Sequence, residues 1–380
     1  MKPRQASTRL YYMDNLRALA MLAGVFFHAA LGYSPMMHSV WPSADQQNHW
    51  LFDVFAWGIH VFRMPVFFVM AGFFCALLLN KNGGKVFLKN RLLRIALPIV
   101  IFLPLLSIAT IFVIQYALEQ VQNKNPFLHF IQTSMALPEP PTPPFSTMHL
   151  WFLYHLLFLY LLAYAIHILQ WHSLTKWVTS LQPTSLVLVL ITTCIPALYA
   201  VSVPFPAPEW IFPALWALWF YGLFFALGYG FFSKAKLIEQ FEQRLATYLL
   251  IGLISYVIYY YLLPRNLLPA DQQPQGLYKL VLTMLEAICA VLLTLSAVLY
   301  AKRFLNSNSV FMCYVAKLSY WVYIVHLPLI FYIQFLIMDS EWHLVIKFLV
   351  SSLGALAISI LTFHLFVSWS WLSHILVSKS

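Results

Sequence analysis

The sequence predicts an all-α integral membrane protein, a polytopic bundle of about ten transmembrane helices. Hydrophobic residues make up 62% of the 380 residues and charged residues only 9%, whereas a soluble domain carries roughly a quarter charged residues. The apolar runs reach about 20 residues, which is the length of a spanning helix and twice that of a barrel strand. Lipid must therefore solvate most of the surface, and helices satisfy the backbone polar groups internally.

The apolar runs define the expected spans of one membrane domain, residues 1–380. Asp14 and Arg17 interrupt the first run early, so we expect a retained span and not a cleaved signal peptide. Proline-rich connectors at 138–144 and 203–208 break the apolar pattern. The ten expected spans are 11–34, 50–80, 88–118, 149–170, 184–203, 210–232, 245–263, 277–301, 310–338 and 343–376.

Basic residues collect in alternate connections along the chain. The intervening connections hold only Lys124, Arg265 and Lys279. Because basic loops lie on the cytoplasmic side, both termini are predicted to be cytoplasmic, and the net charge of +10 does not indicate nucleic acid binding. The basic set is Lys2, Arg4, Arg9, Lys81, Lys85, Lys89, Arg91, Arg94, Lys176, Lys234, Lys236, Arg244, Lys302 and Arg303.

No sequence pattern points to a metal or a soluble-enzyme site. Cys75, Cys194, Cys289 and Cys313 lie singly in apolar runs and are interpreted as small buried hydrophobic residues. Neither HExxH, CxxC, a glycine-rich phosphate loop nor a GxSxG turn is present. We therefore expect no metal cofactor.

The first span carries charge on one helical face. Arg17 and His28 are eleven residues apart, which is about three turns and about 16 Å along the axis. Asp14 and Gly24 share this face, and the glycine permits close approach of a backbone or an extended ligand. Alternatively, Arg17 reaches the membrane surface and His28 only hydrogen-bonds within the bundle.

The second span holds His60 and Arg63, neighbours on one face three residues apart. Pro65 frees the carbonyl of Val61 and is expected to kink the helix, so Arg63 indicates a polar cavity. Alternatively, Arg63 has a structural role and pairs with Asp53 or Asp14.

The third span begins with Lys89, Arg91 and Arg94. We expect the two arginines at a helix N-terminus, where backbone N–H groups favour anions, and arginine binds phosphate with two hydrogen bonds. Alternatively, this basic segment anchors the helix to lipid headgroups.

The ninth span carries Ser319, Tyr323 and His326 on one polar face. Hydrogen bonding between helices is the alternative to a catalytic role for them. His149, Glu286 and other isolated polar residues are interpreted as structural or interfacial.

Four segments in order resemble the acyltransferase-3 family of bacterial membrane acyltransferases, over essentially the whole chain. They are R-x10-H (Arg17, His28), F-R-M-P-x-F-F around Arg63, R-x-x-R (Arg91, Arg94) and S-Y-x-x-Y-x-x-H-x-P (Ser319 to Pro328). D-N-L-R, F-F-H-A-A-L-G-Y-S and H-L-W-F-L-Y are most similar to the branch with the osmoregulated periplasmic glucan succinyltransferases. The chain has no fused C-terminal hydrolase-like domain, so we expect it to complete transfer alone.

The resemblance implies transfer of an acyl group, succinyl or acetyl, from cytoplasmic acyl-coenzyme A. The acceptor would be a hydroxyl of an extracytoplasmic polysaccharide or glycolipid, including periplasmic glucan, at a bacterial inner membrane. Arg91, Arg94 and Lys89 would bind the coenzyme, whose pantetheine arm would pass Gly24.

Within that resemblance, His28 would act as the general base or carry the acyl group itself. Arg17 lies on the same face of the first span. Arg63, or Tyr323 with His326, would stabilise the oxyanion.

A secondary transporter or exporter of a small anionic or glycan substrate is the rival class, because intramembrane His, Arg and Glu also form proton relays. The sequence shows no inverted repeat and no matched pair of broken helices. A non-catalytic flippase or scaffold is the third possibility. Binding of coenzyme A and an acylated product would distinguish an enzyme from both.

Overall fold

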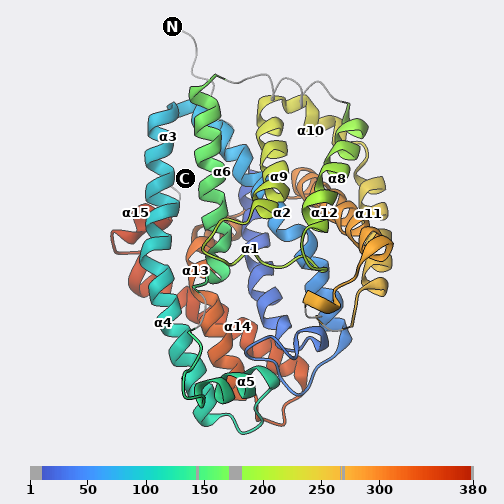
Figure 1. Cartoon of the computed structure of the whole chain (residues 1–380). Coiled ribbons are helices and arrows are strands. Elements are labelled where there is room, and N and C mark those ends of the chain that lie inside the picture. The colour runs from blue at the N-terminus through green and yellow to red at the C-terminus, as the bar shows by residue number, and fades with distance from the viewer. Residues whose placement is uncertain (1–10, 143–144, 171–181, 266, 268–269, 378–380) are drawn as a thin grey trace.

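The computed structural model describes residues 11–142, 145–170, 182–265, 267 and 270–377. These residues form helices and connecting loops, with one isolated bridge between Ser146 and Trp210 and no strand within the described ranges. The helices run side by side as an elongated bundle (Figure 1). Lys2, Arg4, Arg9 and Lys176, which contribute to the predicted orientation, lie outside the described residues.

Eight helical segments are long and apolar enough to cross a membrane, so the chain is a multi-pass membrane protein. They are α2 (Trp50–Asn82), α3 with α4 (Gly84–Gln120), the segment of α6 (Met148–Ile168), α9 (Leu215–Ser233), α11 (Leu245–Leu262), α12 (Gly276–Phe304), α13 (Val310–Ile337) and the segment of α14 (Leu344–Val367). Shorter helices are α5 (Pro126–Met135), α10 (Ala235–Glu242) and α15 (Leu372–Leu376).

The other two expected spans correspond to α1 (Tyr11–Leu31) and α8 (Pro183–Tyr199). Helix α8 has 17 residues, and α1 is less apolar because it carries Asp14, Asn15, Arg17 and His28. Helix α1 contacts α2, α12, α13 and α14, so much of its surface faces protein. The total of ten crossings stays a prediction.

Alternate connections lie at opposite ends of the bundle (Figure 1). At the end defined here as the basic end, Asn15 Nδ2 donates to the carbonyls of Leu305 and Ser307, and Lys302 pairs with Glu242 at 2.7 Å. At the opposite end, the Asp339 carboxylate accepts from the N–H groups of Gln122 and Asn123. The described basic loops therefore share one end, as the charge pattern predicted.

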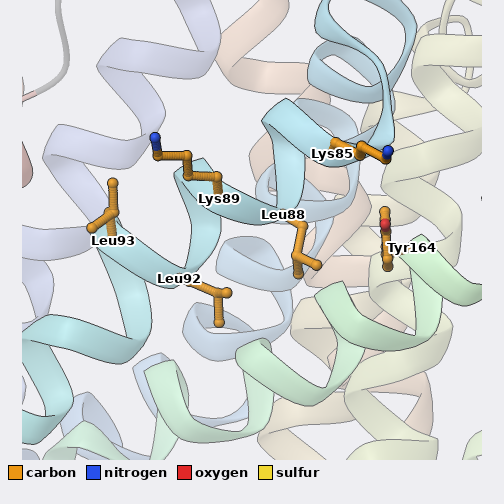
Figure 2. Close-up of a pocket in the computed structure, with 6 residues that line it drawn as sticks. All are labelled: Lys85, Leu88, Lys89, Leu92, Leu93 and Tyr164. Atoms are coloured by element: carbon orange, nitrogen blue, oxygen red, sulfur yellow. The ribbon is translucent and has the colours of Figure 1, made fainter.

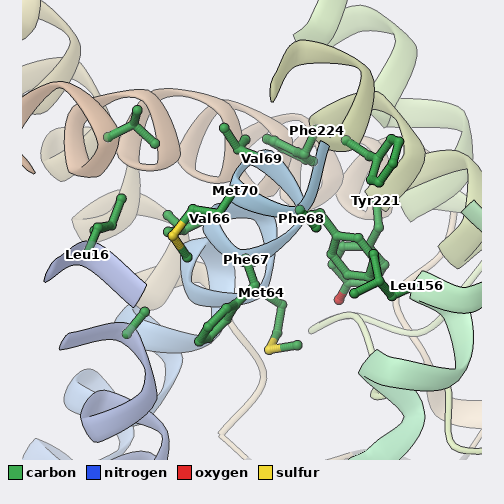
Figure 3. Close-up of a cluster of buried hydrophobic side chains, with 14 of the residues drawn as sticks. Leu16, Met64, Val66, Phe67, Phe68, Val69, Met70, Leu156, Tyr221 and Phe224 are labelled. Carbon is green, nitrogen blue, oxygen red and sulfur yellow. The ribbon is translucent and has the colours of Figure 1, made fainter. Parts of the chain in front are cut away.

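Helix α2 packs backbone to backbone against α9. A Cβ on Gly72 would lie 1.9 Å from the carbonyl oxygen of Phe225, and a Cβ on Gly228 would lie 1.8 Å from that of Val69. Small residues allow such close approach between membrane helices. Side chains of α2 fill the spaces towards α1, α6 and α9 (Figure 3). This contact fixes α2, and with it Arg63, in the centre of the bundle.

Buried polar contacts hold the 32–49 loop at the opposite end. Lys347 Nζ donates to Asp45 Oδ2 and to the Met338 carbonyl, both at 2.8 Å, and the Lys347 side chain is 1% exposed. Asn125 Nδ2 donates to the carbonyls of Pro42 and Ala44. The loop therefore places Trp41 firmly, with its ring stacked 5.9 Å from that of His28.

We predict that Asn82 faces the cytoplasm and Glu139 the other side of the membrane. Cysteines introduced at each position, in a protein whose native cysteines are replaced, are treated with a membrane-impermeant maleimide. In intact cells Glu139→Cys should be labelled, and Asn82→Cys only after permeabilisation, because basic loops remain cytoplasmic. Labelling of Asn82→Cys from outside intact cells would overturn the orientation.

Candidate functional site

Polar side chains from four elements meet inside the bundle towards the opposite end. We call this set the histidine–arginine cluster: His28 of α1, Arg63 of α2, His149 of the 3-10 turn before α6, and Tyr323 and His326 of α13. The rings of His28 and His326 lie 5.2 Å apart, as do those of His149 and His326. Arg63 Cζ lies 4.7 Å from the Phe27 ring, which adjoins His28.

Gly24 makes the space that the Arg63 guanidinium occupies. A Cβ on Gly24 would lie 2.4 Å from Arg63 Nη1. The close approach predicted at this glycine is therefore made by a side chain of the same protein. Any larger residue at position 24 would force the Arg63 guanidinium to move.

Arg63 forms no ion pair with any described residue. Asp14 pairs with Arg17 at 3.2 Å, and Asp53 accepts hydrogen bonds from Ser34 and from the N–H of Met36. The alternative of a structural Arg63 paired with Asp14 or Asp53 is therefore wrong. A cation at this depth without a carboxylate is costly, so it marks a place where an anion is stabilised.

The backbone of α13 fixes the tautomer of His326. Its Nδ1 lies 2.8 Å from the Tyr323 carbonyl oxygen and 3.1 Å from that of Val322, so Nδ1 carries the proton. The neutral ring then has a lone pair at Nε2, which is buried and has no hydrogen-bond partner among the described residues. Neutral His326 is therefore an oriented base and has no N–H to offer an oxyanion.

His149 is fixed in the other tautomer by Pro328. Because Pro328 has no N–H, it leaves the carbonyl of Ile324 without its helical donor. His149 Nε2 lies 2.9 Å from that carbonyl and donates to it, which leaves Nδ1 as a buried acceptor without a described partner. The sequence led us to interpret His149 as structural or interfacial. The position of Pro328, four residues after Ile324, was the one sequence feature that indicated a carbonyl in need of a side-chain donor.

Two predicted residues serve other contacts. The Tyr323 hydroxyl donates to the His149 carbonyl at 2.6 Å, so its proton is already engaged. His60 Nε2 donates to the Phe205 carbonyl at 2.8 Å, and the Phe205 N–H donates to Glu286 Oε1. His60 and Glu286 thus hold the 203–208 segment against the bundle.

The basic residues near the start of α3 divide between two faces. Arg91 lies over the rings of Phe87 and Tyr160, and Arg94 Nη2 donates to the Val377 carbonyl at 3.0 Å. Lys89 is exposed, and with Lys85 it lines a surface pocket beside Leu88, Leu92, Leu93 and Tyr164 (Figure 2). The structure therefore separates Lys89 from the contacts of the two arginines.

The expectation that a helix begins at Arg91 and Arg94 is wrong. Helix α3 begins at Gly84, and a π-helical turn, Leu92–Ala96, joins it directly to α4. The backbone N–H groups near the arginines are therefore used within the helix. Pro98 instead frees the carbonyl of Arg94, and the Tyr320 hydroxyl donates to it at 2.7 Å.

Arg17 lies outside the cluster, about three turns along α1 towards the basic end. Its guanidinium pairs with Asp14 one turn away, and the two side chains are 31% and 20% exposed. Arg17 therefore lies near the basic end of the bundle, whereas His28 lies inside it in the cluster.

Comparison with known proteins matches the family described as an acyltransferase domain to residues 10–364. The chain belongs to the acyltransferase-3 family. Relatives named Glucans biosynthesis protein C, from Salmonella paratyphi B and Salmonella typhi, are 29% identical over 336 residues, which is 84% of this chain and 82% of the relative. No solved structure matches the chain. This acyltransferase-3 member is a membrane acyltransferase that transfers groups other than aminoacyl groups.

The cluster offers the groups that acyl transfer needs. An attacking hydroxyl requires a base, and the tetrahedral intermediate requires a donor or a cation beside its oxyanion. His28, His149 and His326 offer basic nitrogens, and Arg63 is the cation. The described residues contain no group of three or more His, Cys, Asp or Glu arranged to hold a metal ion.

We predict that Gly24→Ala lowers acyl transfer on the order of a hundredfold with little effect on folding, because Arg63 must shift by about 1 Å. The control is Gly230→Ala, since a Cβ at Gly230 meets no atom within 4 Å. Turnover and the melting temperature in detergent are measured for both variants. Equal turnover in the two variants would show that the position of Arg63 does not matter.

Proposed function

We propose that this protein is an O-acyltransferase of the bacterial inner membrane that moves a succinyl or acetyl group from cytoplasmic acyl-coenzyme A to a hydroxyl of an extracytoplasmic glycan. The observation that carries this is the cluster itself: an arginine without an ion-pair partner among the described residues lies beside three histidines, inside a membrane acyltransferase. The name of the Salmonella relatives, Glucans biosynthesis protein C, supports periplasmic glucan as the acceptor.

The donor would enter from the basic end. Arg91, Arg94 and Lys89 lie there, and guanidinium groups bind phosphate well. Arg94 now donates to carbonyls of the C-terminal segment, so phosphate binding would exchange one set of oxygen acceptors for another. The extended pantetheine arm would follow α1 past Arg17 and bring its thioester to His28, beside the Arg63 guanidinium that fills the space at Gly24.

The acceptor hydroxyl would reach His28 from the opposite end, beneath Trp41. His28 removes the hydroxyl proton while the oxygen attacks the thioester carbonyl. Arg63 stabilises the resulting oxyanion, because Tyr323 and His326 have their protons engaged on carbonyls. The C–S bond then breaks, and the proton passes to the thiolate. In the second route, His28 carries the acyl group before the hydroxyl attacks.

Arg63 also bears on the acyl group. A partly buried guanidinium that has no carboxylate partner among the described residues suits an acyl chain that brings one, and arginine pairs with carboxylates through two parallel hydrogen bonds. Of the two candidate groups, succinyl has a free carboxylate and acetyl has none. Arg63 therefore favours succinyl.

The decisive experiment uses His28→Ala. Loss of a general base costs about 10²–10⁴-fold in rate, while a His28→Ala protein that still folds should bind the donor normally. Product formation is followed by mass spectrometry of the glycan, and folding by the melting temperature. The exposed His129→Ala is the control. A stable His28→Ala protein with near-wild-type turnover would move the catalytic role to His326.

Arg91→Ala and Arg94→Ala should each weaken coenzyme A binding by about 1.5–3 kcal/mol, the usual cost of losing a hydrogen bond to a charged group. Calorimetric titration in detergent measures this. The exposed Arg303→Ala, at the same end of the bundle, should leave affinity unchanged. Wild-type affinity in both variants would leave the arginines as structural contacts only.

A further inference from the structure

His149 and His326 present two lone pairs to the centre of the cluster. The carbonyls of Val322 and Tyr323 hold the proton of His326 on Nδ1, and the carbonyl of Ile324 holds that of His149 on Nε2. The remaining nitrogens, Nε2 of His326 and Nδ1 of His149, are both buried acceptors without a described partner. Two acceptors cannot bond to each other, so both are available to a donor that lies beside them.

His28 is placed to act as that donor. Its Nδ1 is buried and also has no described partner, and its ring lies 5.2 Å from that of His326. Hydrogen bonds of this kind are often long before substrate binds and tighten in the reacting complex. A proton on His28 Nδ1 would leave Nε2 of His28 as the base, because a neutral imidazole has one donor and one acceptor.

We propose that His149 and His326 form a positioning pair for His28. His326 Nε2 accepts from His28 Nδ1–H and so selects the His28 tautomer, while His149 Nδ1 adds a second lone pair beside it. Together they stabilise the imidazolium that His28 becomes when it removes the hydroxyl proton. The proton returns from His28 to the thiolate as the C–S bond breaks, so no net proton is taken up.

The surroundings contain no described carboxylate that would do the same work. The titratable and charged groups beside the pair are His28 of α1, Arg63 of α2 and Tyr323 of α13, and His60 of α2 lies beside His28. Tyr323 donates to the His149 carbonyl and His60 to that of Phe205. Arg63 is a cation and opposes a second positive charge, so neutral acceptors are what His28 has available.

Pro328 is the origin of this arrangement. With any other residue at position 328, an N–H would compete for the Ile324 carbonyl and release His149. Pro328→Ala should therefore act on the same step as a change at His149. Pro104 provides a matched control, since it is also inside a helix, α4, and is exposed.

The test compares His149→Gln with wild type. Glutamine keeps an N–H donor for the Ile324 carbonyl, so the protein should fold, but its amide oxygen is a weaker acceptor than the imidazole Nδ1 and lies at a different point. We expect an unchanged KM for the donor and kcat lower by about tenfold to a hundredfold, less than the 10²–10⁴-fold of a lost base. Pro328→Ala should give a similar loss, Pro104→Ala none, and the double variant of His149 and Pro328 less than the sum of the two effects.

Because the kinetic part rests on the proposed function, histidine ¹⁵N solid-state NMR gives a readout that does not need turnover. Wild type should show His149 Nδ1 and His326 Nε2 without protons, and the His28 Nδ1–H signal should shift in His149→Gln. An unchanged His28 signal would overturn the proposal, whatever the activity. If wild type transfers no acyl group but the shift occurs, the proposed function fails while the positioning pair stands. If the His28 signal shifts in His149→Gln but kcat stays normal, the positioning pair has no part in the reaction.

Discussion

The hydrogen bond from His149 to the Ile324 carbonyl is the interaction on which the site depends. The hydrocarbon core offers no water to a backbone carbonyl, so one freed by a proline must be satisfied by the protein. Pro328 frees this carbonyl, and His149 reaches it across 175 residues of sequence. The start of α6 is thereby held against α13, and His149 is held in one tautomer beside His326.

The same constraint operates near the basic end with a different outcome. Pro98 frees the carbonyl of Arg94, and the neutral Tyr320 hydroxyl satisfies it. There the bond stabilises the π-helical turn that contains Arg94 and introduces no basic nitrogen. The donor to the Ile324 carbonyl is a histidine and the donor to the Arg94 carbonyl is a tyrosine. Only the first hydrogen bond therefore places a basic nitrogen inside the bundle.

Arg63 gives the cluster its polarity. Its side chain is partly buried with no carboxylate partner among the described residues, and it lies against the backbone of Gly24 and the face of Phe27. Such a charge is costly in the absence of a ligand, so an anion that binds beside it gains an ion pair that no described carboxylate provides. This is the common basis for oxyanion stabilisation and for a preference for an acyl group with a carboxylate.

Local sequence features predicted the parts of the structure that depend on neighbouring residues. Apolar length predicted the helices, helical spacing put Arg17 and His28 on one face, and Gly24 marked a close approach. Contacts between distant segments were beyond such reasoning: His149 with Ile324, and Lys347 with Asp45. The start of α3 at Gly84 was missed because the lysines between Gly84 and Arg91 resemble a loop, although they lie on an exposed helical face.

Transfer across the membrane is the central claim, and its most direct test is a sided assay in proteoliposomes. Purified protein is reconstituted with radiolabelled succinyl-coenzyme A on the side of the basic end and glucan on the other side. The account predicts covalent label on the glucan, dependent on both substrates and lost in Arg63→Gln. Movement of unmodified glucan or free donor without a labelled product would contradict it and would identify a transporter.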